Sequence, residues 1–183
     1  MKPPRKVPDR DSRYMGLAWM QAAFSKDPST QVGATIIDAD NKPLGSGYNG
    51  PPSHINDHCF SWERPPKDDP EAFSKYDLIK HAEENAIKHA RCEDLTGATL
   101  YVTAFPCKNC MLDIVDVGIS RIVYYDFKSD AGSICQSVQR NTSETIADLA
   151  DYGLTIEEFQ GDLSWLTEWI NNLQEKGILP KLD

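Results

Sequence analysis

The chain has no long apolar segment and no excess of basic residues, and both absences narrow its function. No apolar run approaches the roughly 18 residues that a membrane-spanning helix needs. The basic, proline-rich residues 1–11 have no apolar core of a signal peptide. Acidic side chains number 28 against 19 basic ones, a net charge of −9, whereas nucleic-acid surfaces need clustered Lys and Arg. We therefore expect a cytoplasmic protein that binds neither a membrane nor nucleic acid.

Cysteine is sparse, and its number is odd. Five cysteines in a chain of this kind indicate reduced thiols rather than disulfides. Cys107 and Cys110 form a C-x-x-C pair directly after Pro106, and no second such pair exists to complete a structural four-cysteine zinc site. We expect Cys92 and Cys135 to be buried or half-buried thiols.

A second short motif, His81-Ala82-Glu83, completes the set of candidate zinc ligands. His81, Cys107 and Cys110 offer three ligands, which leave a tetrahedral zinc ion one open position for a water. Glu83 can lie beside that water and take its proton. Alone, His81 suits a helix cap, Glu83 a helix-start charge, and the cysteines a redox pair. The combination H-x-E with P-C-x-x-C is much more specific, and it predicts a catalytic zinc.

Apolar periodicity and breakers predict helices alternating with strands along a single domain, residues 1–183. Residues 1–10 are expected to form a loose arm because of their prolines. The expected helices are 11–24, 78–92, 107–118, 143–152 and 163–176, and the expected strands are 32–37, 44–48, 98–103 and 119–126, with an alternating segment at 154–159. Asp11 or Ser12 is the expected N-cap of the first helix, and Gly118 suits a C-cap. This alternation predicts an α/β sandwich of three layers, αβα.

Residues 51–77 are an irregular, proline-rich insertion. A loop of this length inside a domain is often functional, as a lid or a binding loop. His54, His58 and Cys59 could supply part of a second metal site, although no further C-x-x-C pair matches them. The simpler interpretation is a covering loop anchored by its aromatic side chains.

These motifs together resemble the deoxycytidylate (dCMP) deaminases of the cytidine deaminase superfamily. The resemblance extends from about Tyr14 to Asp126, well over half of the chain. The residues that carry it lie in four segments: 25–34 (SKDPSTQVGA), 47–50 (GYNG), 81–87 (HAEENAI) and 101–110 (YVTAFPCKNC). On its own, Asn49-Gly50 would be read as a turn.

The resemblance implies hydrolysis of dCMP to dUMP and ammonia, which supplies thymidylate synthesis. It also implies a five-stranded mixed sheet between helices. By the matching motifs, His81, Cys107 and Cys110 hold Zn²⁺ and Glu83 shuttles the proton. The resemblance further assigns substrate contacts: Asn49 to the sugar, the backbone around Ala82 and around Ala104 and Phe105 to the pyrimidine, and Lys26 and Thr30 to phosphates.

Regulation is implied less directly. Many members are homo-hexamers that dCTP with Mg²⁺ activates and dTTP inhibits. This sequence departs from that pattern after Asp126, in residues 127–132 and in a Trp-rich tail. Allosteric control and the hexameric state therefore stay open.

Other functions remain to be weighed against dCMP deamination. One is a deaminase of dCTP, of a modified dCMP, of cytidine or of another base; a tRNA enzyme would need a basic face, which a net charge of −9 disfavours. Another is a zinc-stabilised binding module without catalysis. Such a module would lack the glutamate, and Glu83 is present.

Overall fold

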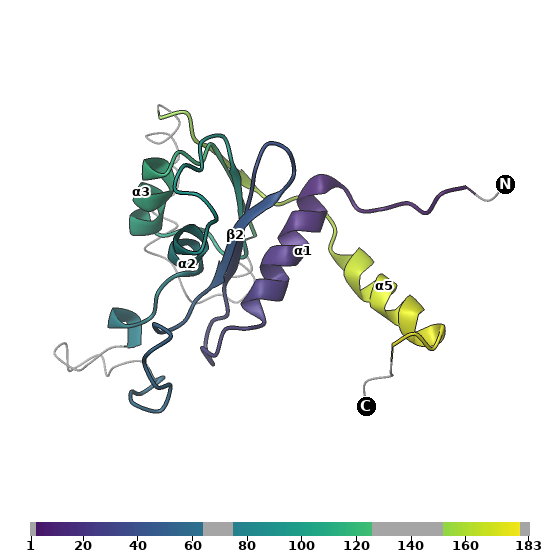
Figure 1. Cartoon of the computed structure of the whole chain (residues 1–183). Coiled ribbons are helices and arrows are strands. Elements are labelled where there is room, and N and C mark those ends of the chain that lie inside the picture. The colour runs from purple at the N-terminus through teal and green to yellow at the C-terminus, as the bar shows by residue number, and fades with distance from the viewer. Residues whose placement is uncertain (1–2, 64–74, 126–151, 180–183) are drawn as a thin grey trace.

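A five-stranded mixed sheet forms the centre of the molecule in our computed structural model, which describes residues 3–63, 75–125 and 152–179 (Figure 1). The strand order is β2-β1-β3-β4-β5, where β1 pairs antiparallel with β2 and β3, and β4 pairs parallel with β3 and β5. The strands are β1 Gly33–Ile37, β2 Pro43–Tyr48, β3 Thr99–Val102, β4 Arg121–Tyr124 and β5 Thr155–Glu158. The predicted mixed sheet is confirmed.

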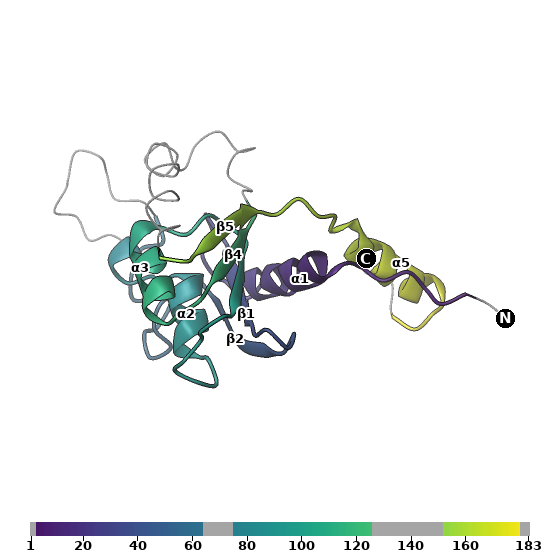
Figure 2. The ribbon, with the colours of Figure 1, turned by 90° about the horizontal axis from the view of Figure 1, so that it is seen from above.

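Helices cover both faces of this sheet, so the predicted αβα sandwich is also confirmed. Helix α1 (Arg10–Ala22) lies on one face, and α2 (Ala82–Lys88) and α3 (Lys108–Asp116) lie on the other, as Figure 2 shows from above. Successive side chains of a strand point to opposite faces. Accordingly, Ile36 packs with α2 and α3 in one apolar cluster, and Ile37 packs with α1 in the other.

Two glycines let the helices lie directly on the strands. A Cβ atom on Gly33 would lie 2.0 Å from the carbonyl oxygen of Ala18 in α1. A Cβ on Gly47 would lie 2.5 Å from the amide nitrogen of Ala86 and 2.6 Å from the carbonyl oxygen of Ala82. The first turn of α2 is therefore held at backbone contact distance from β2.

Helix α1 begins earlier than the sequence predicts. Its N-cap is Asp9, whose carboxylate accepts a hydrogen bond from the amide of Ser12 at 2.9 Å. The prediction of Asp11 or Ser12 as the cap was wrong. Asp11 instead lies in the first turn, where its carboxylate accepts hydrogen bonds from Arg121 and Tyr101.

Helix α2 is shorter than the predicted 78–92. Lys75–Asp77 form a 3-10 turn, η1, and Lys80 pairs with Gly50 in an isolated antiparallel bridge, so the helix begins only at Ala82. After the helix, the amide of Arg91 donates to the carbonyl of Leu44 in β2. Backbone contacts outside the helix thus replace helical ones at both ends.

The other predicted helices and strands within the described residues lie within a few residues of the observed ones. Helix α3 follows Cys107, and Gly118, one residue past its C-cap, has φ +81°. Residues 3–9 form neither helix nor strand. The last helix, α5 (Ser164–Glu175), buries no residue and extends away from the sheet beside α1 (Figure 1). No helix of the described residues is both long and apolar enough to cross a membrane. Most of the predicted helix 143–152 and Cys135 lie outside the described residues.

Candidate active site

The three candidate zinc ligands lie at the starts of two neighbouring helices. His81 is the N-cap of α2, Cys107 is the N-cap of α3, and Cys110 lies in the first turn of α3. Strand β3 leads through residues 103–106 into α3, while the bridge at Lys80 leads into α2. The fold therefore brings residues from both motifs to the same side of the sheet.

The side chains of these residues meet at one point. His81 Nδ1 lies 3.2 Å from Cys110 Sγ and 3.5 Å from Cys107 Sγ, and the two sulfurs lie 3.5 Å apart. This is the one group of three His, Cys, Asp or Glu side chains in residues 3–63, 75–125 and 152–179 that could hold a metal ion.

These distances and atoms fit zinc. Ligand atoms about 2.0–2.3 Å from a tetrahedral ion lie roughly 3.3–3.8 Å from one another, close to the observed 3.2–3.5 Å. An imidazole nitrogen and two thiol sulfurs are donors that zinc prefers. Because the three side chains fill three corners of a tetrahedron, they would leave the fourth open, as a catalytic zinc site requires.

Hydrogen bonding within the cluster shifts the pKa of each of its three members. The hydrogen bond between Cys107 and Cys110, aided by His81, lowers the pKa of Cys107 to about 3. The same bond to Cys107, together with burial, raises the pKa of Cys110. The hydrogen bond to Cys107 raises the pKa of His81 to about 8, against the effect of burial. A thiolate is thus present at neutral pH, which favours a cation.

Glu83 lies two residues after His81, in the first turn of α2, and is 4% exposed. Burial raises the pKa of its carboxyl group, while a backbone hydrogen bond and the charge of His81 oppose that rise. A buried carboxyl group beside a metal cluster is a common arrangement for proton transfer.

Hydrogen bonds to neighbouring residues fix the start of α2. The amide of His81 donates to the Glu84 carboxylate at 2.7 Å. The Asn85 side-chain amide donates to the carbonyl of Tyr48, at the end of β2, at 2.8 Å. The backbone position of His81 is therefore tied both to its own helix and to the sheet.

Comparison with known families decides what kind of site this is. Residues 8–126 match the model of the cytidine and deoxycytidylate deaminase zinc-binding region. The chain belongs to this family. The deoxycytidylate deaminase of Homo sapiens is 37% identical over 115 residues, 63% of this chain and 64% of that protein. The enzyme of that name from Saccharomyces cerevisiae is 33% identical over 159 residues, 85% of this chain and 46% of that protein. The chain thus spans less than two thirds of the length of these curated relatives.

A solved structure shares the fold of this deaminase family member. The dCMP deaminase from the cyanophage S-TIM5, in complex with dCMP and dUMP, aligns with a TM-score of 0.61 at 22% identity. The alignment covers 85% of this chain and all of that one. It supports the assignment of the αβα sandwich.

The backbone of Asn49, the expected sugar contact, lies next to the backbone of the metal ligand His81. Gly50 and Lys80 form an antiparallel bridge with hydrogen bonds of 3.0 and 2.9 Å. The next residues on either side of that bridge are Asn49 and His81, so the GYNG segment runs beside the metal-binding turn. The Asn49 side chain, in a residue 7% exposed, also bonds the amide of Val32 and the carbonyl of Thr30.

The other expected substrate residues differ in how deeply they are buried. Ala82 and Ala104 are buried at the starts of the two segments that carry the ligands, and the Phe105 ring packs edge-to-face on Tyr124 with centroids 4.9 Å apart. Thr30 lies in the loop after α1. The side chain of Lys26 is 68% exposed and pairs with Asp57 of the insertion.

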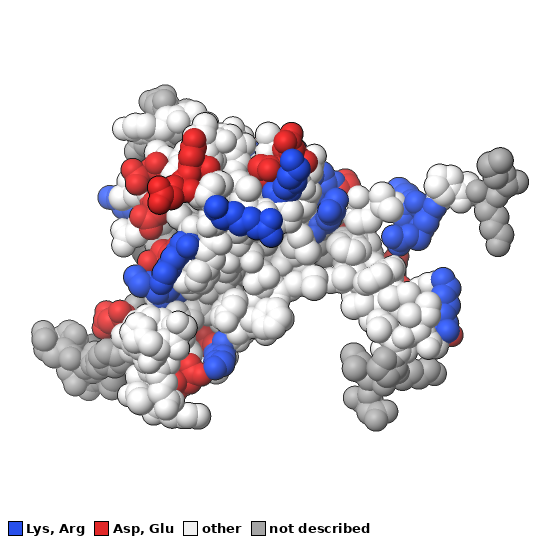
Figure 3. Space-filling model, viewed as in Figure 1, with Lys and Arg blue, Asp and Glu red and all other residues white. Residues whose placement is uncertain are grey.

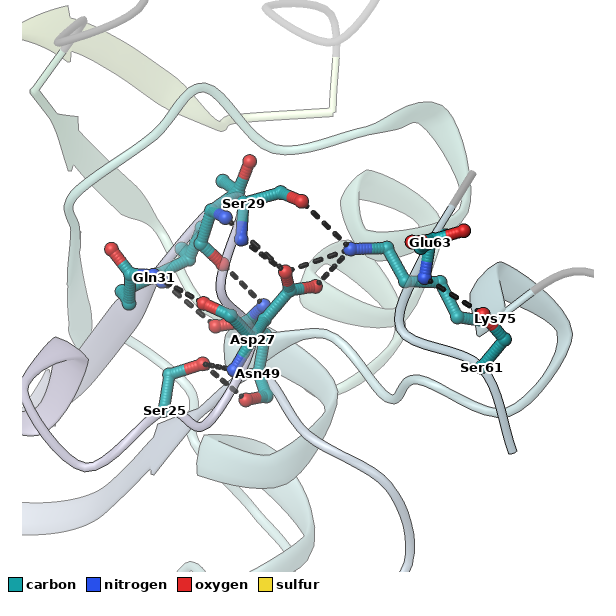
Figure 4. A network of polar contacts seen from close by, with 10 residues as sticks. Ser25, Asp27, Ser29, Gln31, Asn49, Ser61, Glu63 and Lys75 are labelled. Carbon is teal, nitrogen blue, oxygen red and sulfur yellow. Dashed lines mark hydrogen bonds and ion pairs between the residues drawn. The ribbon is translucent and has the colours of Figure 1, made fainter. Parts of the chain in front are cut away.

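One buried residue near the proposed site, Lys75, was not predicted from the sequence. Lys75, in η1, is 1% exposed and donates to both carboxylate oxygens of Asp27, at 2.7 and 3.0 Å (Figure 4). A lysine at the end of a polar insertion carries no motif, and its partner lies 48 positions away. No signal in the sequence could have identified the pair.

The structure bears on the possible second metal site and on the predicted burial of Cys92. His54, His58 and Cys59 are exposed, and the described residues bring no metal-binding group together around them. Cys92 was predicted to be buried or half-buried, but it is exposed. It follows the end of α2 in a surface turn, where its thiol contacts the carbonyl of Asp94.

A cavity of about 710 Å³ lies between the GYNG segment, the insertion and the outer face of α2. None of the three cluster residues lines it. Its charged lining includes Lys26, Lys80 and Lys88 together with Asp57 and Glu84. Both signs of charge are interspersed over the face of the molecule in Figure 3.

Proposed function

We propose that this chain hydrolyses dCMP to dUMP and ammonia, with zinc held by His81, Cys107 and Cys110. The observation that carries the proposal is the meeting of these three side chains within 4.8 Å beside buried Glu83. The family and the identity to deoxycytidylate deaminases support the choice of substrate. Such a reaction would supply dUMP for thymidylate synthesis.

In this proposal, the protein residues position the substrate and move a proton. Bound zinc supplies a Lewis acid and makes a water acidic enough to ionise near neutral pH. The Glu83 carboxylate would take one proton of a water molecule and give it to N3 of the pyrimidine, while the water oxygen bonds to C4. Glu83 would then carry the second proton from the C4 hydroxyl to the amine nitrogen, so that the C4–N bond breaks, ammonia leaves and the C4 carbonyl of dUMP forms.

The nucleotide would lie between the two ligand-bearing turns and the GYNG segment. The backbone around Ala82 and Ala104 would read the pyrimidine edge. An amide side chain has two donor hydrogens and two acceptor lone pairs, so two loop contacts leave Asn49 capacity for the sugar. Phe105 would contact the pyrimidine base. Lys26 and Thr30 would face the 5′-phosphate, and Lys26 would release the Asp57 carboxylate in order to bind it.

The nucleotide preference is tested by comparing turnover of dCMP, deoxycytidine, dCTP and cytidine by the zinc-loaded chain. Ammonia release and dUMP formation are measured at equal substrate concentrations. We expect dCMP to give the highest kcat/KM. Equal rates for dCMP and deoxycytidine would contradict the proposal, because they would mean that the 5′-phosphate is not bound.

We further propose a regulated homo-hexamer, in which the 710 Å³ cavity takes dCTP with Mg²⁺ as an activator or dTTP as an inhibitor. Lys80 and Lys88 suit phosphates and the nearby carboxylates suit Mg²⁺. Turnover of dCMP with and without each effector, together with the mass of the assembly by light scattering, tests this. Rates that neither nucleotide changes would contradict the regulation, and a monomer would contradict the hexamer.

We also propose that the protein acts in the cytoplasm, because the cysteines of the cluster must stay reduced to bind zinc.

A further inference from the structure

A buried ion pair joins two loops that the proposed deaminase site uses separately (Figure 4). The Lys75 ammonium group donates to the two carboxylate oxygens of Asp27 at 2.7 and 3.0 Å. Their side chains are 1% and 4% exposed. Asp27 belongs to the loop after α1, and Lys75 to the turn that precedes the zinc-binding motif.

Asp27 organises its own loop around the carboxylate. The amides of Ser29 and Thr30 donate to Asp27 Oδ1 at 2.8 and 3.3 Å, and Lys75 also donates to the Ser29 hydroxyl at 3.3 Å. The Gln31 side chain donates to the Asp27 carbonyl. Residues 27–31 thus take their shape from a single buried anion.

The same loop holds Asn49 on three sides. The Asn49 side-chain nitrogen donates to the carbonyl of Thr30 at 2.9 Å, and its oxygen accepts from the amide of Val32 at 2.8 Å. The Ser25 hydroxyl donates to the Asn49 carbonyl at 2.8 Å. The orientation of Asn49 therefore depends on the loop that Asp27 shapes.

The backbone of Lys75 leads directly to the metal ligands. Its carbonyl accepts from the amides of Leu78 and Ile79 at 3.0 and 2.9 Å. The bridge between Lys80 and Gly50 follows immediately, and then His81. One residue thus fixes the approach to His81 with its backbone and the loop at Asn49 with its side chain.

Stability alone does not account for this pair. Desolvation of two buried charges largely cancels their attraction, and an apolar replacement of a buried ion pair is often neutral or stabilising. A charged pair does impose a specific geometry that an apolar contact would not. We propose that Lys75 is a positioning residue for nucleotide binding, which sets Asn49 through Asp27. This rests on the proposed function.

The test compares Lys75→Met with the double variant Asp27→Asn/Lys75→Met, in zinc-loaded protein. Lys42→Met, which removes an exposed lysine from the β1–β2 turn, is the control. The single variant leaves a buried unpaired carboxylate, so we expect a lower Tm and a KM for dCMP raised about tenfold, the effect of one lost hydrogen bond. Because Glu83 and the ligands are unchanged, kcat should stay within about twofold.

The double variant separates positioning from stability. It has no buried charge at positions 27 and 75, so its Tm should return toward that of the wild type, while its KM stays about tenfold high. A KM that recovers together with Tm would overturn the proposal, since it would show a merely structural pair. Lys42→Met should match the wild type in KM.

A second measurement requires no nucleotide. Amide hydrogen exchange at Ser29 and Thr30 should be faster in Lys75→Met than in the wild type or in Lys42→Met. Unchanged exchange would overturn the coupling between Lys75 and the loop. If the wild type does not deaminate dCMP, the proposed function fails, but the exchange result still decides the coupling.

Discussion

His81 Nδ1 lies 3.2 Å from the sulfur of Cys110, although 29 positions separate the two residues. Their helices start side by side on one face of the sheet because α2 packs on the glycines of β2 and α3 follows β3. A nitrogen and two sulfurs at these distances form a metal-binding group.

Loss of either cysteine should remove the metal. Cys107→Ser and Cys110→Ser should each reduce zinc from about one ion per chain to below about a tenth. Cys92→Ser is the matched control, since Cys92 is exposed and outside the cluster, and it should keep its zinc. Zinc is measured by elemental analysis after dialysis. Full zinc occupancy in Cys110→Ser would exclude this ligand set.

Chelation should also destabilise the fold. An ion that binds only the native state adds stability through mass action. Removal of zinc should therefore lower Tm, and re-addition should restore it, whereas in Cys107→Ser neither step should change Tm. Differential scanning calorimetry with and without a chelator checks this. A wild-type Tm that is indifferent to the chelator would argue against a bound structural or catalytic ion.

A methyl group at Gly47 should displace the start of α2. In Gly47→Ala, the new Cβ would meet backbone atoms of Ala82 and Ala86 at 2.5–2.6 Å, which cannot move as a side chain can. We expect a loss of about 2 kcal/mol in the free energy of unfolding, as for other overpacked sites, and reduced deamination. Gly50→Ala, whose Cβ would meet nothing closer than 3.8 Å, should unfold as the wild type does. Equal denaturant midpoints for the two variants would contradict this packing.

The contribution of Asp11 to stability should depend on pH. Hydrogen bonds from Arg121 and Tyr101 hold the pKa of Asp11 below its ordinary value of 3.8. A carboxyl group whose folded pKa is lowered stabilises the protein above the unfolded pKa and loses that effect as pH falls through the folded pKa. Asp11→Asn should therefore be less stable than the wild type at pH 7, and the difference should shrink below about pH 4.

Urea denaturation at pH 7 and at pH 3 measures the stability difference between Asp11→Asn and the wild type. Asp40→Asn serves as the control because the Asp40 carboxylate pairs with Lys42 on the surface, where such pairs contribute little. A difference between Asp11→Asn and the wild type that persists unchanged at pH 3 would mean that ionisation of Asp11 is not responsible.

The sequence predicts local order well where a pattern repeats within one element. The apolar positions of α3 and α5 and the β-rich run of β1 locate these elements within a few residues. The zinc ligands were predicted for a different reason, since three ligand types at a specific spacing are rare by chance. The structure brings these three side chains together.

The sequence predicts poorly what depends on distant partners. The apolar spacing from Ile79 to Ala90 suggests a longer α2, but the bridge at Lys80 and the bond from Arg91 to Leu44 end it on both sides. Asp27 and Lys75 each look like ordinary surface residues in the sequence. They are buried only because the fold brings them together.

The most direct test of the deaminase proposal compares the wild type with Glu83→Gln and Glu83→Ala, with dCMP as substrate and the zinc content of each protein measured. Glu93→Gln, an exposed acid after α2, is the control. We predict that both Glu83 variants keep zinc and the wild-type fold by circular dichroism but form no detectable dUMP, because no other group would move the proton. Undiminished dUMP formation would contradict the role of Glu83, and loss of zinc would make Glu83 a ligand instead.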